Sequence, residues 1–141
     1  MYLEDFHLNM TFPLPSVTID QEEMIAFSKR YDPFPIHHDE NYAKTTRFGK
    51  LIAPGVMSFM TLWAKFVELD LFGEELIAGK STKIEWFKPV FAGDVLTGEM
   101  RVSAITERNA YNGIVETTMD VRNQDGDLVL SDITETVVKR K

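Results

Sequence analysis

Residues 31–55 read YDPFPIHHDENYAKTTRFGKLIAPG, and this stretch determines how the rest of the chain is interpreted. Pro33 and Pro35 keep its first half out of a helix, because proline lacks the N–H that a helix interior needs and clashes with the preceding turn. Asp32 and His37 lie five residues apart on this proline-fixed segment. A carboxylate and an imidazole held on a rigid loop form a candidate acid–base site.

Capping residues predict a helix on each side of the prolines. Asp20 can accept a hydrogen bond from a free backbone N–H, and Glu23 can bond back to it, which is the pattern of a capping box. This first helix ends at Asp32, because a residue that precedes proline is pushed out of the α region. Asp39 has the same capping character and predicts a second, short helix over residues 40–45.

Residues 56–69, which follow directly, are predicted to form a long and mostly apolar helix. The polar positions in it are Ser58, Thr61, Lys65 and Glu68. At 100° per residue, these four positions lie within an arc of roughly 80°. About three-quarters of the circumference is therefore apolar, and we expect another part of the chain to wrap around this helix.

The second half of the chain supplies strands that can do so. Alternating or β-rich segments predict strands over residues 79–87, 95–107, 114–123 and 128–138. A hairpin turn is predicted over Asn109–Gly113, with Asn112-Gly113 as its strong local signal, and Asp125-Gly126 predicts the next turn. Long strands in an antiparallel meander form a sheet that can curl. The expected fold is α+β, with a curled antiparallel β-sheet wrapped around a long central α-helix.

Length and composition narrow the class of protein. The 141 residues predict a single domain, 1–141, and 44% hydrophobic residues suffice for a core. There is no cysteine, the net charge is −7, and the first residues lack the pattern of a secretory signal. The apolar run over 51–69 is too interrupted for a membrane span. We therefore expect a soluble cytoplasmic protein that binds neither nucleic acid nor membrane.

Two stretches carry a recognisable family pattern. The first reads Asp32-Pro33-Phe34-Pro35-Ile36-His37, then Asp39, Tyr42-Ala43, Phe48-Gly49 and Ile52-Ala53-Pro54-Gly55; the second reads Pro89-Val90-Phe91-Ala92-Gly93-Asp94-Val95-Leu96. In order and spacing they resemble the MaoC-like dehydratases and (R)-specific enoyl-CoA hydratases. That family has the hot-dog fold, a sheet curled around a helix.

The resemblance implies an activity and a site. The activity is reversible hydration of a trans-2-enoyl thioester to a 3-hydroxyacyl thioester. Asp32 and His37 match the catalytic pair of the family, and Gly55 matches the glycine whose backbone N–H binds the thioester carbonyl. The substrate handle would be coenzyme A or an acyl-carrier protein, and the reaction needs no metal or redox cofactor.

Further residues are expected around this pair. Phe34, Ile52, Ala53 and Pro54 are expected to contact the substrate. Two of them depart from the family pattern, in which Asn often stands at the position of Phe34 and His at the position of Pro54. Both departures make the mouth of the pocket more apolar.

Charged neighbours of the site have two interpretations. Lys44, Arg47 and Lys50 could contact coenzyme A phosphates, and a solvated surface is the alternative. His37 and His38 are adjacent, and in an extended segment they would point to opposite sides. We therefore expect no metal site there, and we place His38 at the surface or behind the acid–base pair.

Two other functions stay open at this stage. Hot-dog folds also carry acyl-thioester hydrolysis, so an acyl-CoA thioesterase is one alternative. The other is a non-catalytic acyl-thioester binding subunit, in which Phe34 and Pro54 accompany a loss of turnover. In each case we expect a homodimer or higher homo-oligomer, because a single curled sheet leaves its edge strands open.

Overall fold

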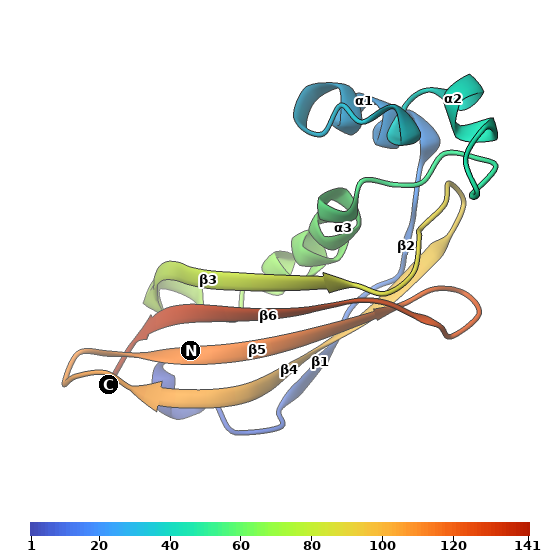
Figure 1. Ribbon diagram of the computed structural model, residues 1–141. Helices are drawn as coiled ribbons and strands as arrows, with labels where there is room; N and C mark the ends of the chain where they lie inside the picture. The colour runs from blue at the N-terminus through green and yellow to red at the C-terminus, as the bar shows by residue number, and fades with distance from the viewer.

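One antiparallel sheet with a helix across one of its faces forms the framework of the molecule (Figure 1). The structure is a computed structural model and describes residues 1–141. Its strands are β1 (Thr11–Pro13), β2 (Val17–Thr18), β3 (Leu76–Trp86), β4 (Val95–Glu107), β5 (Asn112–Arg122) and β6 (Leu128–Lys139). The order across the sheet is β1-β4-β5-β6-β3, and β2 pairs separately with β4.

The helices lie on one side of this sheet. They are α1 (Gln21–Tyr31), α2 (Glu40–Lys44) and α3 (Gly55–Glu68). Single 3₁₀ turns lie before β1 at Leu3–Asp5, between α1 and α2 at Pro35–His37, and between α3 and β3 at Gly73–Glu75. Figure 1 shows α3 lying along the sheet, with α1 and α2 together beyond its N-terminal end. The arrangement confirms the predicted sheet wrapped on a long helix. No helix has the length and apolar character needed to span a membrane.

The predicted helix starts are confirmed by their hydrogen bonds. The Asp20 carboxylate accepts from the backbone N–H of Glu23 at 2.9 Å, and the Asp39 carboxylate accepts from that of Tyr42 at 3.0 Å. Each bond satisfies one of the N–H groups that a helix start leaves free. The first bond fixes where α1 begins, and the second fixes where the loop after α1 ends and α2 begins.

The predicted turn over Asn109–Gly113 is present, but it begins and ends slightly earlier than expected. The β4–β5 turn lies at residues 108–111, and Asn112 already belongs to β5. The side-chain oxygen of Asn109 forms this turn by accepting from the N–H groups of Tyr111 and Asn112. Gly113 has a packing role instead, because a Cβ there would collide with the side chain of Leu3.

Burial around α3 corrects another expectation. Met57, Phe59, Leu62 and Phe66 are buried against the sheet, and so is Ser58, which the polar arc had placed outside. Conversely, Val56, Met60 and Val67 are 45%, 45% and 57% exposed. The sheet of one chain therefore covers only part of the apolar surface of α3, because β3, at the sheet edge, has no further strand beside it.

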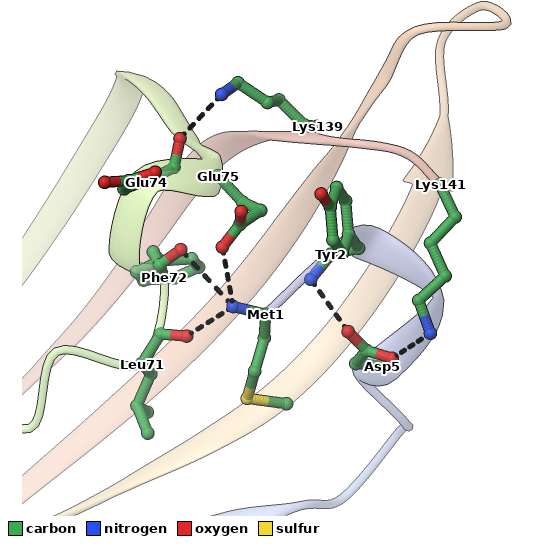
Figure 2. A network of polar contacts seen from close by, with 9 residues as sticks. All are labelled: Met1, Tyr2, Asp5, Leu71, Phe72, Glu74, Glu75, Lys139 and Lys141. Atoms are coloured by element: carbon green, nitrogen blue, oxygen red, sulfur yellow. Dashed lines mark hydrogen bonds and ion pairs between the residues drawn. The ribbon is translucent and has the colours of Figure 1, made fainter.

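Met1 forms hydrogen bonds with the segment between α3 and β3 (Figure 2). The amino group of Met1 donates to the carbonyls of Leu71 and Phe72 at 3.0 and 3.3 Å, and it lies 3.3 Å from the carboxylate of Glu75. Lys139, at the end of β6, donates to the carbonyl of Glu74 at 2.7 Å. These contacts hold the start of β3 against its neighbour in the sheet.

An acidic side chain, Asp132 of β6, is fully buried on the helix-facing side of the sheet. One of its oxygens contacts Thr82 Oγ1, the other lies 2.6 Å from Thr134 Oγ1, and the two threonine oxygens are 2.8 Å apart. Three contacts need three hydrogens, but the two hydroxyls supply only two. The carboxyl group supplies the third only when it is protonated.

Burial favours the same protonated form. Loss of hydration raises the pKa of Asp132 above its ordinary value, although hydrogen bonds from Thr134 and Thr82 oppose the shift. A raised pKa in the folded state means that folding is favoured most below the ordinary pKa of the group. That contribution is lost as the pH rises through the folded-state value.

We expect Phe59→Ala to reduce the free energy of unfolding by about 3–5 kcal/mol, through lost transfer energy and a cavity between α3 and the sheet. Phe59 is only 6% exposed and stacks on Trp63 with ring centroids 5.6 Å apart. Urea unfolding measures the change. Lys65→Ala on the same helix is the control. A cost below ~1 kcal/mol would mean that α3 does not pack as described.

We expect Asp132→Asn to be increasingly more stable than the wild type as the pH rises. An asparagine amide preserves all three contacts with Thr82 and Thr134 and never ionises. Urea unfolding across a pH series measures the difference, with Asp120→Asn, whose carboxylate is exposed and bonded to Ser131, as the control. If the free energy of unfolding of Asp132→Asn is below that of the wild type by the same amount at every pH, Asp132 is not protonated in the folded protein.

Candidate active site

Asp32 and His37 are brought together by the turn that follows α1. Asp32 is the C-terminal cap of α1, and its φ and ψ of −152° and 70° are not helical. The chain then forms a 3₁₀ turn over Pro35–His37 rather than the extended segment expected. As a result, Asp32 Oδ2 lies 3.5 Å from His37 Nε2.

The other ring nitrogen of His37 determines what faces Asp32. His37 Nδ1 lies 2.9 Å from the carbonyl oxygen of Ile52. A carbonyl oxygen can only accept, so Nδ1 carries the hydrogen and Nε2 of the neutral ring has a free lone pair. The Asp32 carboxylate and Nε2 therefore face each other as two acceptors. This arrangement suits a water molecule that donates one hydrogen to each of them.

Backbone pairing holds the segment that carries Ile52. The N–H of Ile52 donates to the Ile36 carbonyl at 3.3 Å, and the N–H of Ala53 donates to the Val90 carbonyl at 2.7 Å. Val90 belongs to the loop between β3 and β4. Asp94 stabilises this loop, because its carboxylate accepts from the N–H of Phe91 at 2.9 Å. The second stretch of the family pattern, residues 89–96, thus holds the end of the first stretch in place through the Ala53–Val90 bond.

The start of α3 borders the same site. Pro54 caps the helix without a side-chain hydrogen bond, and the N–H groups of Gly55, Val56 and Met57 donate to no protein acceptor. The indole of Trp86 packs on Gly55, where a Cβ would lie 2.6 Å from Trp86 Nε1. Glycine is thus required here by the close approach of Trp86. A helix N-terminus with free N–H groups favours negative charge.

These groups line one cavity of about 460 Å³. Its walls are formed by Asp32, Phe34, His37, Arg47, Phe48, Ile52, Ala53, Gly55, Val56, Ser58, Trp86, Phe87, Lys88, Pro89 and Val90. Of the site residues predicted from the sequence, seven are therefore together. Pro54 is not among the lining residues. Lys44 and Lys50 line a neighbouring cavity of about 300 Å³ instead, together with Glu40.

Two cationic side chains near the cavity make cation–π contacts with aromatic rings. Arg47 stacks over Phe48 at 4.9 Å, and Lys50 lies 4.3 Å from the ring centre of Phe91. Lys88, which the sequence did not single out, lines the cavity and lies 3.0 Å from the Asp127 carboxylate. The cavity itself therefore has two cations at its wall, Arg47 and Lys88.

Sequence reasoning missed the wall that β3 contributes. Trp86 and Phe87 are half-exposed aromatic residues at the end of that strand, and together with Phe34 they surround the cavity with aromatic rings. A clue was present, because a tryptophan and a phenylalanine directly precede Lys88-Pro89 at the end of an alternating strand. Their position beside Gly55 depends on long-range packing and not on local sequence.

The family is shown by comparison with known proteins. The profile described as "MaoC like domain" matches residues 7–124. The chain therefore belongs to the MaoC-like dehydratase family, and its fold is the hot-dog fold. Among curated proteins, it is 26% identical to the uncharacterized protein YdeM of Bacillus subtilis over 88% of this chain and 89% of that protein.

A second curated relative is longer than this chain. The chain is 35% identical to a UPF0336 protein of Mycolicibacterium paratuberculosis, over 68% of this chain and 60% of that protein. The aligned region thus spans about three-fifths of that relative.

Solved structures agree with this assignment. The monoamine oxidase regulatory protein of Archaeoglobus fulgidus superposes with a TM-score of 0.95 at 25% identity, covering 100% of this chain and 95% of that one. The MaoC-like dehydratase of Rhodospirillum rubrum gives 0.89 at 30% identity, covering 100% and 98%. The (R)-hydratase from A. caviae involved in PHA biosynthesis gives 0.76 at 28% identity, covering 98% and 99%. The family and these neighbours support hydratase or dehydratase activity.

We expect Gly55→Ala to displace the indole of Trp86. Replacing glycine with alanine at a compatible helical position usually adds about 0.4–1 kcal/mol of stability. Here that gain should be absent in the wild-type background and should appear in a Trp86→Ala background. Urea unfolding of the four proteins of this double-mutant cycle measures the coupling. An equal gain in both backgrounds would show that Trp86 does not pack on Gly55.

Proposed function

We propose that the protein catalyses reversible hydration of a trans-2-enoyl thioester to a 3-hydroxyacyl thioester. The observation that carries the proposal is the pairing of Asp32 with His37, 3.5 Å apart, in the cavity that also contains the start of α3. The sequence match at these positions and the family membership support it. Two acceptors for a water molecule and a donor for an oxyanion then stand in one site.

The first half of the proposed reaction is the attack of water. Asp32 and His37 Nε2 each accept one hydrogen of a single water molecule, and this orients its oxygen toward C3 of the enoyl group. As the C–O bond forms, Nε2 takes the proton of the water. His37 remains aligned during this step because Nδ1–H donates to the Ile52 carbonyl.

The second half concerns the charge that the addition creates. Electrons of the conjugated double bond move to the thioester oxygen, which becomes an enolate. The free N–H of Gly55 and the positive end of α3 stabilise that oxygen. The proton taken from the water is then delivered to C2, and the pair returns to its starting form. Dehydration is the same sequence in reverse, and it requires no metal or redox cofactor.

The residues of the cavity wall support a proposal for the acyl group and for its handle. Phe34, Trp86 and Phe87 offer aromatic contact to the acyl part, and Ile52 and Ala53 add apolar surface. Arg47 and Lys88 are the cations placed to meet phosphates of a coenzyme A or carrier-protein handle. Lys44 and Lys50 line the neighbouring cavity and are therefore not assigned to this contact.

We also propose that the whole chain functions as one MaoC-like domain within a homodimer. The strand β3 lies at one edge of the sheet, and its side away from β6 has no partner strand. Apolar side chains are exposed next to this edge: Leu76 and Ile77 on β3, and Met60 and Val67 on α3. A second copy that pairs along β3 would extend the sheet and cover the open side of α3.

We expect Asp32→Asn and His37→Ala each to reduce hydration of a short enoyl-CoA on the order of 10²–10⁴-fold, while the fold is retained. The double variant should lose no more than the worse single variant, because the pair handles one water and acts as a unit. Loss of conjugated enoyl absorbance measures the rate. His7→Ala, an exposed histidine outside the site, is the control and should retain full activity.

The same assay separates this proposal from its rivals when free thiol is followed in parallel. Thiol release with the conjugation unchanged would identify a thioesterase. Tight acyl-CoA binding with neither reaction would identify a binding subunit. Full hydration by His37→Ala would refute the proposed role of that histidine.

We expect sedimentation to show a dimer at micromolar concentration, and Val67→Glu to shift it toward a monomer. A carboxylate there would be buried without a partner in the proposed interface. Ile133→Glu is the matched control, because Ile133 is an exposed apolar residue on the opposite face of the sheet. A wild type that is monomeric and fully folded would overturn the dimer.

A further inference from the structure

A second histidine, His38, is linked to the back of the acid–base pair. His38 Nδ1 lies 3.0 Å from the hydroxyl oxygen of Ser28, and that oxygen lies 2.7 Å from the carbonyl oxygen of Asp32. Ser28 is fully buried in the last turn of α1. His38 does not line the cavity that contains His37. The two adjacent histidines are thus linked to different parts of Asp32. His37 faces the side chain of Asp32, and His38 is linked through Ser28 to its backbone carbonyl.

The hydrogen bonds that link His38, Ser28 and Asp32 can have only one direction. A serine hydroxyl has one hydrogen, and the Asp32 carbonyl can only accept. The 2.7 Å separation is typical of an O–H···O hydrogen bond, so the Ser28 hydroxyl donates to Asp32. The remaining contact then requires His38 Nδ1 to carry a hydrogen and donate to Ser28. The relay therefore runs from His38 to Ser28 to the Asp32 carbonyl.

The relay ends at the backbone carbonyl of Asp32, and the backbone conformation of Asp32 determines where its carboxylate lies. Asp32 has non-helical φ and ψ and precedes Pro33, so only its N–H takes part in the backbone hydrogen bonding of α1. Its N–H donates to the Ser28 carbonyl at 2.9 Å, and its own carbonyl also accepts from the N–H of Phe34 at 2.9 Å. Removing the Ser28 hydroxyl leaves that carbonyl with a single donor, the N–H of Phe34, and so removes one of the restraints on ψ of Asp32.

We propose that Ser28 and His38 are positioning residues that hold the Asp32 carboxylate at its distance from His37. This inference rests on the proposed hydratase function, since it assigns a role in the same site. Misplacement of a reacting group by 1 Å can cost about 10²-fold in rate. Loss of one of several backbone restraints should cost less, roughly tenfold in kcat.

Kinetics of four variants test the relay. Ser28→Ala and His38→Ala should each lower kcat roughly tenfold with KM unchanged, because the reacting groups move while the substrate walls stay in place. His38→Asn should retain most activity, since its amide can donate from nearly the same position as Nδ1. The Ser28→Ala/His38→Ala double variant should be no slower than the worse single variant. Ser131→Ala, outside the site, is the control for loss of a bonded serine hydroxyl.

Ring nitrogen NMR supplies a readout that does not depend on turnover. At alkaline pH, where imidazoles are neutral, His38 should be the Nδ1–H tautomer. Ser28→Ala should shift the His38 Nδ1 resonance and also the His37 Nε2 resonance, because the Asp32 carboxylate beside it moves. A wild type without hydratase activity would refute the proposed function, and the NMR experiment would still decide the relay.

Three results would overturn the positioning role. One is a folded Ser28→Ala variant with wild-type kcat. Another is His38 as the Nε2–H tautomer in the wild type. The last is a His37 Nε2 resonance that Ser28→Ala leaves in place.

Discussion

The bond between His37 Nδ1 and the Ile52 carbonyl is the constraint on which the site depends. It assigns the hydrogen of the neutral imidazole to the buried side of the ring and leaves the lone pair of Nε2 facing Asp32. Without it, Nε2 could carry the hydrogen and bond directly to the carboxylate, and the two groups would no longer act together on a water molecule. The chemistry proposed for the site follows from the direction of this one bond.

Other parts of the fold keep the two partners of that bond in place. Ile52 is fixed by one backbone hydrogen bond to the turn that carries His37 and by the Ala53–Val90 bond to the β3–β4 loop. The same segment leads directly into α3, whose buried face packs against the sheet. The proposed oxyanion donor, the histidine and the loop that aligns it are therefore parts of one packed unit. The proposed function uses the rigidity of this unit, since small displacements of reacting groups are costly.

Local signals in the sequence predicted much of this framework. Asp20 and Asp39 identified helix starts, and the alternating strands with the apolar helix identified the sheet-on-helix fold. Long-range contacts could not be predicted in the same way. Asp132 has the pattern of a solvent-facing residue in a strand, yet it is buried beside Thr82, fifty residues earlier in the chain. The contact of Trp86 with Gly55 likewise has no local signal, because it depends on how β3 crosses the start of α3.

We propose that one water adds across the conjugated bond and that its proton goes to C2. Incubating the wild-type protein with crotonyl-CoA in deuterated, ¹⁸O-labelled water tests this claim directly, with the products followed by mass spectrometry. We expect intact 3-hydroxybutyryl-CoA that carries ¹⁸O on C3 and one deuterium on C2. Free coenzyme A with ¹⁸O in a released carboxylate, and no deuterium on carbon, would contradict it.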